Sequence, residues 1–207
     1  MKIKKIAAIC KPWKRVDLIT QSEGRTIDAQ YIKAGAGIYP VRGLPAINPE
    51  QLLTLFDIPE NKRDDWTAER LPPDPDRYNL ADMDEHERPV YMIPFEFRWG
   101  ETEYQPVKTS RGVLLIPAEL FGPLELGTGM FDLFERENSF GELYLAAKVG
   151  MILQGLIFPQ DILTEHFMEA FRSFYRGIEV SYEGTMERNE IRLEQTRKNL
   201  GIEEENE

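Results

Sequence analysis

Residues 142–159, ELYLAAKVGMILQGLIFP, decide the fold of this chain. Leu143–Ala147 and Met151–Phe158 are almost wholly apolar, and a short stretch containing Gly150 lies between them. Two such runs joined by a turn predict a β-hairpin, and apolar residues at successive positions predict strands buried on both faces. We therefore expect this hairpin to form the core of the C-terminal half.

A helix is expected directly after the hairpin, from Asp161 to about Arg176. Its apolar residues recur at i, i+3 and i+4 and make one broad stripe: Ile162, Leu163, Phe167, Ala170, Phe171 and Phe174. Further short strands are expected between Pro89 and Glu135. Together these elements predict an α+β fold with a mostly antiparallel sheet and a packed amphipathic C-terminal helix.

The N-terminal half begins with a basic segment, since six Lys and Arg residues precede the first acid, Asp17. We interpret residues 2–15 as an edge strand whose lysines discourage pairing with other chains, or else as a basic arm for an acidic partner. Residues 14–42 alternate as a β-hairpin does, and Ala34–Gly37 reads as a bend rather than a phosphate loop, because no helix follows it.

One clear helix start follows in this half at Asn48-Pro49-Glu50, where Asn48 serves as the N-cap. A second short helix is expected from Glu60 to Arg70. The stretch 60–88 holds ten acids against five bases, with three prolines at 72, 73 and 75. Such a composition is typical of an exposed loop or linker.

Four segments are therefore predicted. Residues 1–71 form a β-hairpin and helix lobe, 72–88 a Pro/Asp-rich linker or loop, 89–180 an antiparallel β and helix lobe, and 181–207 a thin acidic helix and tail.

The composition excludes several classes of protein. With 42% apolar and 11% aromatic residues the chain is not intrinsically disordered, and no apolar run approaches the length of a membrane span. A net charge of −11 argues against direct nucleic-acid binding. The single cysteine, Cys10, permits no internal disulfide and fits a reducing cytoplasm; in its apolar run it is expected to be packed rather than nucleophilic.

The weak candidates for a metal site are Asp82, Asp84, Glu85, His86 and Glu87, which bring four carboxylates and an imidazole together within six residues. The spacing does not match an EF-hand, HExxH is absent, and one cysteine excludes the usual structural zinc sets. A solvated loop is the favoured interpretation. No catalytic residue, cofactor site or metal site is assigned, and the enzyme hypothesis has no positive support.

Three stretches resemble small uncharacterised proteins encoded in prophages of Gram-positive gut bacteria: Ile38-Tyr39-Pro40 with Gly43-Leu44-Pro45, the run Leu52–Ile58, and the hairpin Leu143–Pro159. The resemblance covers most of residues 10–180 and carries no functional residue over. It implies a cytoplasmic, phage-encoded protein of the bacterial host that acts in replication, regulation or host takeover.

The favoured functional hypothesis is a non-enzymatic protein-binding or regulatory protein that contacts a protein partner or itself, the latter as a homodimer through residues 184–200. Two alternatives stay open. One is an acidic inhibitor that mimics nucleic acid and blocks a DNA-binding partner; the other, less favoured, is a metal-dependent enzyme that uses the 82–87 cluster.

Overall fold

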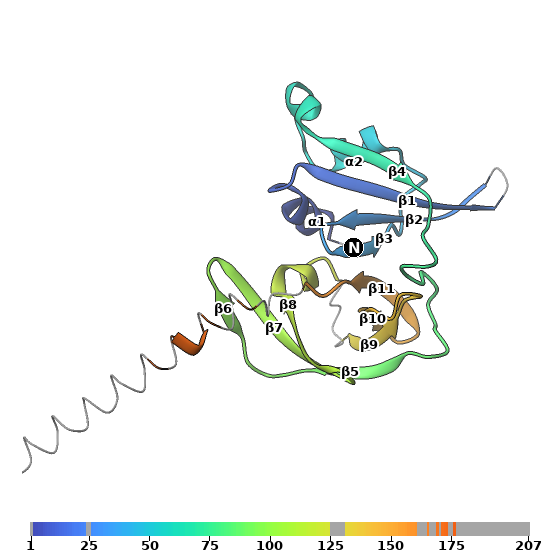
Figure 1. Ribbon diagram of the computed structural model, residues 1–207. Coiled ribbons are helices and arrows are strands. Elements are labelled where there is room, and N and C mark those ends of the chain that lie inside the picture. The colour runs from blue at the N-terminus through green and yellow to red at the C-terminus, as the bar shows by residue number, and fades with distance from the viewer. Residues whose placement is uncertain are drawn as a thin grey trace, which may run out of the picture. The chain divides into compact units, whose positions relative to one another are not determined.

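Figure 1 shows a computed structural model that describes residues 2–23, 26–124 and 131–160, together with Glu165, Glu169, residues 171–173 and Arg176. The chain divides into two units, Met1–Gln160 and Asp161–Glu207. The described residues of the second unit are helical and fall within the helix expected over 161–176. The rest of that helix and its packing, the 181–207 segment and the dimer contact predicted at 184–200 lie outside the described residues.

Four strands make the N-terminal half of the sheet. β1 (Arg15–Glu23), β2 (Thr26–Ala34) and β3 (Gly37–Pro40) form an antiparallel meander, and β4 (Thr67–Leu71) pairs with β1 in parallel. β2 and β3 are joined by the two-residue turn Gly35-Ala36, in which Gly35 has a φ of +55°. The bend predicted at this point is confirmed.

The prediction of an N-terminal edge strand is wrong, because Ile3–Cys10 form helix α1. Ile6, Ile9 and Cys10 follow i, i+3, i+4 spacing and are all buried, while Lys4, Lys5 and Lys11 on either side of this run are exposed. An apolar run of five residues fits a strand and a short helix equally well, so periodicity alone did not separate the two.

Helix α2 (Pro49–Leu55) begins where the sequence predicts it. The Asn48 side chain accepts from the Gln51 amide at 2.8 Å, and the Gln51 side chain accepts from the Asn48 amide at 2.9 Å, which completes a capping box. The helix expected over Glu60–Arg70 is only a 3₁₀ turn, η1 (Glu60–Asp65). Thr67–Leu71 is extended instead, because its backbone pairs with β1.

Seven strands make the C-terminal half: β5 (Arg88–Met92), β6 (Phe97–Trp99), β7 (Thr102–Thr109), β8 (Gly112–Pro117), β9 (Asp132–Glu137), β10 (Leu143–Val149) and β11 (Ile152–Ile157). A 3₁₀ turn, η2 (Ala118–Phe121), follows β8. The strand order is β4-β1-β2-β3-β11-β10-β9-β5-β7-β6, and β8 pairs with β7. The predicted hairpin is confirmed as β10 and β11. Every described pair except β1–β4 is antiparallel, which confirms the mostly antiparallel sheet.

β3 and β11 join the two halves. Ile38 pairs with Leu156 and Gly37 with Ile157, so the sheet runs from one half into the other within the unit Met1–Gln160. Tyr39 is buried at this junction and donates a hydrogen bond to the Leu120 carbonyl at 2.7 Å. Its ring fills the space in front of two glycines. A Cβ at Gly37 would lie 2.6 Å from Tyr39 Cζ, and one at Gly155 would lie 3.0 Å from Cδ1.

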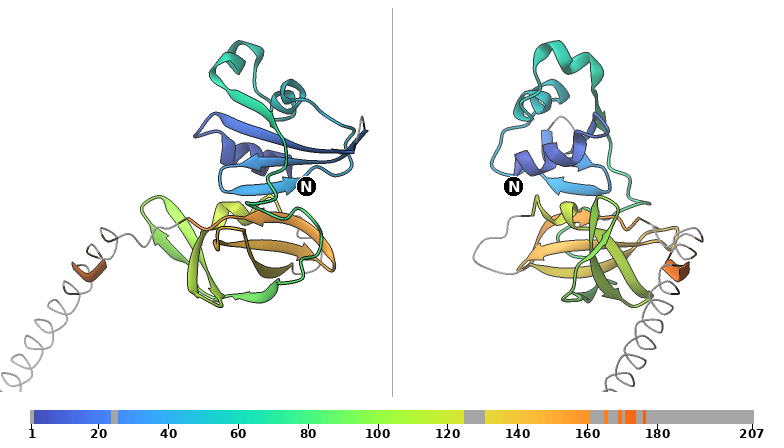
Figure 2. Two further views of the ribbon diagram at one scale, coloured as in Figure 1. Left: turned by 45° about the vertical axis from the view of Figure 1, so that its right-hand side comes forward. Right: turned by 90° about the vertical axis from the view of Figure 1, so that its left-hand side faces the viewer.

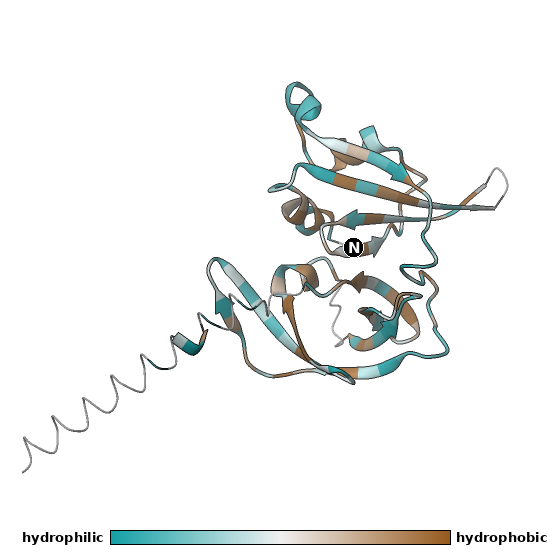
Figure 3. Ribbon diagram, viewed as in Figure 1, coloured by the Kyte–Doolittle hydropathy of each residue, from teal (hydrophilic) through white to brown (hydrophobic). Residues whose placement is uncertain are grey.

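Two apolar clusters lie on the two faces of the sheet. Leu18 and Ile32 belong to the cluster that packs on α1 and α2, whereas their chain neighbours Ile19 and Tyr31 belong to the other. Because successive side chains of a strand point to opposite faces, apolar runs bury both. Figure 3 shows the resulting brown stretches in the strands and in α1. Among the described residues, no helix has the length and apolar character needed to cross a membrane.

We predict that Gly37→Ala destabilises the protein by about 1–3 kcal/mol, because the new methyl group overlaps the Tyr39 ring. Urea unfolding followed by circular dichroism measures this loss. The cost of Gly37→Ala should fall when Tyr39→Leu is already present, since the overlapping ring atoms are then gone. Equal costs in both backgrounds would contradict the proposed overlap.

Candidate functional site

Residues 72–87 connect β4 to β5, and we call this segment the strap. Figure 2 follows it from the upper half of the sheet to the lower half. Its Tyr78 is only 7% exposed and belongs to the second apolar cluster. The Tyr78 ring lies edge-on to Phe158 at 6.1 Å, and Phe158 stacks on Tyr144 at 5.5 Å. The stretch predicted as a linker or loop therefore covers part of the core.

Side chains from both halves of the sheet bind the strap's backbone. Tyr31 of β2 donates its hydroxyl to the Leu80 carbonyl at 3.3 Å. From β10, the Tyr144 hydroxyl oxygen accepts the Asn79 amide at 2.9 Å. Burial raises the pKa of both tyrosines, so both hydroxyls stay neutral and keep these bonds near neutral pH.

Arg136 of β9 makes the most extensive contact with the strap. Its side chain is fully buried, and all five of its N–H groups have acceptors. Nη1 donates to the carbonyls of Asn79 and Ala81, both at 3.0 Å, and Nη2 to the Asp82 carbonyl at 3.2 Å. The remaining N–H of Nη2 and that of Nε reach Glu87 Oε2 at 2.8 and 3.0 Å.

Glu87 lies between two buried cations. Its second oxygen accepts from Nζ of Lys148. The Lys148 side chain is 3% exposed, and its Nζ lies 4.7 Å from the centre of the Phe134 ring. Two cations thus share one carboxylate, and the three strap carbonyls on Arg136 supply further negative potential. The backbone of the strap is therefore part of the charge balance of the core.

We predict that Arg136→Met destabilises the protein by about 3–5 kcal/mol, because three strap carbonyls lose their donors and Glu87 keeps only Lys148. Urea unfolding gives the size of the loss. Trypsin should also cleave faster after the strap's Arg77. The matched control is Arg98→Met, which removes an exposed guanidinium on β6 and should change stability by less than about 0.5 kcal/mol. Equal effects of the two substitutions would show that Arg136 does not hold the strap.

Asp82, one of the predicted metal candidates, binds the edge of β11 instead. Its Oδ1 accepts the Leu153 amide at 2.8 Å, while Arg42 Nη2 donates to the Leu153 carbonyl at 2.6 Å. The two side chains lie 3.8 Å apart. Since β3 ends at Pro40, they take the place of a neighbouring strand beside Leu153.

The other four candidates do not share a partner either. Asp84 accepts from the Asn79 side chain at 2.9 Å and from the His86 amide at 3.0 Å. Burial would raise the pKa of Asp84, but these hydrogen bonds and the charge of Arg136 outweigh burial and lower it. Glu87 binds Arg136 and Lys148, and Glu85 and His86 are exposed. In the described part of the chain, no group of three or more His, Cys, Asp or Glu could hold a metal ion.

A cleft of about 830 Å³ opens between the strap, β2 and the turn after β9. This volume is in the range of ligand-binding sites. The rings of Tyr31, Tyr78 and Tyr144 contribute to its wall. Its charged lining consists of four carboxylates and one guanidinium, from Asp28, Asp82, Asp84, Glu137 and Arg42. The cleft is thus partly aromatic and carries an excess of negative charge.

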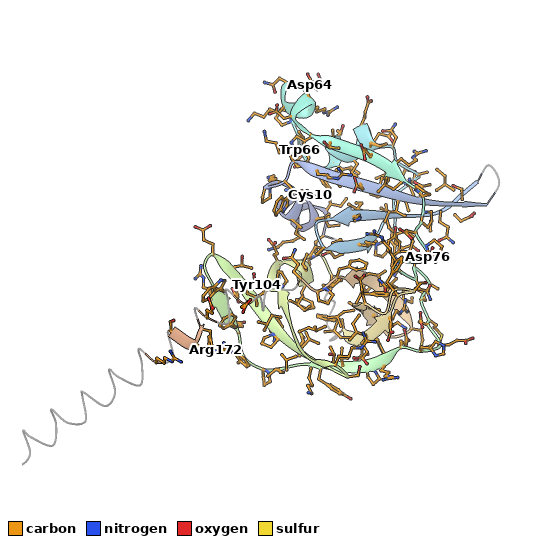
Figure 4. The ribbon with its side chains drawn as sticks, in the orientation of Figure 1. Cys10, Asp64, Trp66, Asp76, Tyr104 and Arg172 are labelled. Atoms are coloured by element: carbon orange, nitrogen blue, oxygen red, sulfur yellow. The ribbon has the colours of Figure 1, made fainter. Side chains whose placement is uncertain are left out.

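The turn after β9, which lines the cleft, also binds the strap. The Ser139 amide donates to the Asp76 carbonyl at 3.0 Å, and Figure 4 labels Asp76 on the strap. Glu137 in turn accepts from Arg111 at 2.6 Å. The Ser139–Asp76 hydrogen bond thus joins two walls of the cleft, the strap and the turn after β9.

Sequence reasoning found the strap's acids but missed the residues that bind them. Arg136 follows the last residue expected in a strand before the hairpin, and Lys148 lies in the hairpin that the sequence predicts to be buried; the structure places them on β9 and β10. Lys148 is the one charge in the otherwise apolar segment LYLAAKV and is itself a signal, because Lys and Arg are almost never fully buried without a partner, whereas Arg136 stands among other charges in DLFERE and gave none. Arg42 and the tyrosines gave no such signal, since their roles depend on where the strap crosses the sheet.

Cys10, the single cysteine, is fully buried on α1 against the sheet (Figure 4). Burial, together with the negative charge of Asp17, raises the pKa of its thiol to about 12. A thiol needs its thiolate form to act as a nucleophile. Cys10 is therefore packed and chemically inert, as the sequence predicts.

We predict that Cys10 does not react with Ellman's reagent in the native protein at pH 8. At this pH about one thiol in ten thousand is ionised when the pKa is about 12, and the sulfur is buried. In denaturing urea the same cysteine should react completely within minutes. Rapid reaction without denaturant would contradict the buried position of the Cys10 side chain.

Comparisons with known proteins give no match: no family model fits the chain, and neither the curated proteins nor the solved structures contain a similar one. The geometry of the cleft and of the exposed surface is therefore what indicates a function for this chain.

Proposed function

We propose that this chain is a non-enzymatic protein-binding protein, and that the cleft beside the strap receives a basic segment of its partner. One observation carries this proposal: a cleft of about 830 Å³ has four carboxylates and three tyrosine rings in its lining against a single guanidinium. Lys and Arg side chains combine a cationic end with an apolar stem. Carboxylates and aromatic rings together suit both parts of such a side chain.

The rigidity of the cleft supports a binding role. Tyr31 holds the strap from the N-terminal half of the sheet, and Tyr144 and Arg136 hold it from the C-terminal half. A site formed in advance loses less conformational entropy when a partner binds. The strap, which forms one wall of the cleft, thus loses little conformational entropy when a partner binds.

The two alternative functions have less support. The nucleic-acid mimic needs acids on one uninterrupted face, whereas several exposed acids pair with bases: Asp65 with Lys14, Glu69 with Arg15, Asp74 with Arg77, and Glu137 with Arg111. The metal-dependent enzyme needs the 82–87 carboxylates to converge, whereas Asp82, Asp84 and Glu87 accept from different donors.

The phage origin and the cytoplasm of a bacterial host stay predictions that rest on the resemblance described above. If both hold, the partner is a protein of the phage or of the host cytoplasm. Self-association is a further form of the same function, and the homodimer through 184–200 stays a prediction as well.

The test measures binding of a short fluorescein-labelled peptide of repeated Arg-Leu-Arg units by fluorescence anisotropy. Asp28 is exposed in the lining of the cleft, so Asp28→Arg should weaken binding about ten-fold while leaving the fold intact. The matched control is Asp64→Arg, the same charge change on the exposed 3₁₀ turn η1, which Figure 4 labels away from the cleft. It should bind as the wild type does.

Two results would contradict the proposal. Equal weakening by Asp28→Arg and Asp64→Arg would mean that the peptide responds to overall charge alone. Equal binding of a Gln-Leu-Gln peptide would mean that the carboxylates of the cleft do not select a basic partner.

A further inference from the structure

Helix α1 presents a cationic stripe to solvent. Lys4, Ala8 and Lys11 are exposed at i, i+4 and i+7, so they follow one another along one side of the helix. The two lysines are about 10 Å apart along the axis at the standard helical rise. The small Ala8 between them leaves room for an approaching backbone, and Lys2 and Lys5 extend the charge toward the start of the helix.

These four lysines are not neutralised. None of them forms an ion pair within the described residues. The next two basic residues do form ion pairs: Lys14 binds Asp65 at 3.0 Å, and Arg15 binds Glu69 at 3.2 Å. The α1 segment thus gathers four exposed lysines within ten residues, on a chain whose net charge is −11.

Trp13 lies at the end of this stripe. It is 77% exposed, the largest exposed fraction among the large hydrophobic residues of the described chain. The Trp13 amide donates to the Cys10 carbonyl at 3.2 Å, so the backbone of Trp13 is bound to the last turn of α1. Aromatic residues with this exposure on an ordered turn are common in protein interfaces, where Trp is enriched among the residues that contribute most to affinity.

We propose that the α1 face, defined by Lys2, Lys4, Lys5, Ala8, Lys11 and Trp13, docks an acidic polypeptide segment that also carries an apolar side chain. The lysines supply charge complementarity and rate of association, and Trp13 supplies a flat apolar contact for the apolar side chain. This surface selects the charge opposite to the one the cleft selects, so the two sites bind different segments.

A polypeptide fits this face better than a nucleic acid does. Acids lie close to the stripe: Asp65 on η1 pairs with Lys14, which follows Trp13, and Glu119 is exposed on η2, which packs against α1. A nucleic acid carries regularly spaced phosphates and would place some of them against these carboxylates. A short acidic peptide can restrict its charges to the lysine stripe.

The test uses a short fluorescein-labelled peptide of repeated Glu-Leu-Glu units, titrated with the full chain at low salt. The double variant Lys4→Glu/Lys11→Glu should bind this peptide about ten-fold more weakly than the wild type. The control double variant Lys62→Glu/Lys108→Glu makes the same charge change at two exposed lysines outside α1 and should bind normally. Trp13→Ala should weaken binding about three-fold and abolish the change in tryptophan fluorescence on titration.

Three further outcomes overturn or support the proposal. Equal losses in both double variants would overturn the proposal, as would tighter binding of single-stranded oligothymidylate than of the acidic peptide. Sedimentation at low salt identifies one source of the acidic segment: self-association of the wild type that only Lys4→Glu/Lys11→Glu abolishes would support the proposal with a second copy as partner. Because the Arg-Leu-Arg peptide should still bind this double variant, failure here is distinguishable from failure of the cleft proposal.

Discussion

The guanidinium of Arg136 is the contact on which the rest of this unit depends. It is buried within the sheet, and a buried cation is tolerated only when each of its N–H groups has an acceptor. Glu87 accepts from two of these groups and three strap carbonyls accept from the others. The need to give every N–H group of Arg136 an acceptor therefore fixes the position of the nine strap residues 79–87. These residues include part of one wall of the cleft.

The sheet itself follows from a different constraint, the burial of apolar residues on both faces of its strands. One face is covered by helices α1 and α2, whereas the other is covered by the strap. Tyr78 and Tyr144 illustrate why the second face differs. Their rings bury apolar area as core residues do, while the Tyr144 hydroxyl accepts a hydrogen bond from the strap's backbone. The cleft lies beside this strap, and it is there that we propose the partner binds.

The positions of the charged residues correspond to the two proposed surfaces, which the net charge of the chain alone does not reveal. Six bases and no acid precede Asp17, and four of them stay unpaired on α1. The acids of 60–88 are partly used within the fold: Glu87 neutralises buried cations, Asp82 binds the edge of β11, and Asp84 shapes the strap. Proximity in sequence suggested a metal site, but the backbone turns each of these carboxylates toward a different donor.

The sequence by itself determined the local elements whose signals lie within a few residues. The hairpin of β10 and β11, the Asn48 cap of α2, the bend at Gly35 and the packed Cys10 all depend on neighbouring residues, so pattern alone predicted them. Only the tertiary structure decided that residues 3–10 are helical, that 67–71 is a strand, and that the strap crosses the sheet. These outcomes depend on partners 50 or more residues away, such as β1 for β4 and Arg136 for Asn79. A short stretch of sequence cannot predict such contacts, because they contribute free energy only when the distant segments come together.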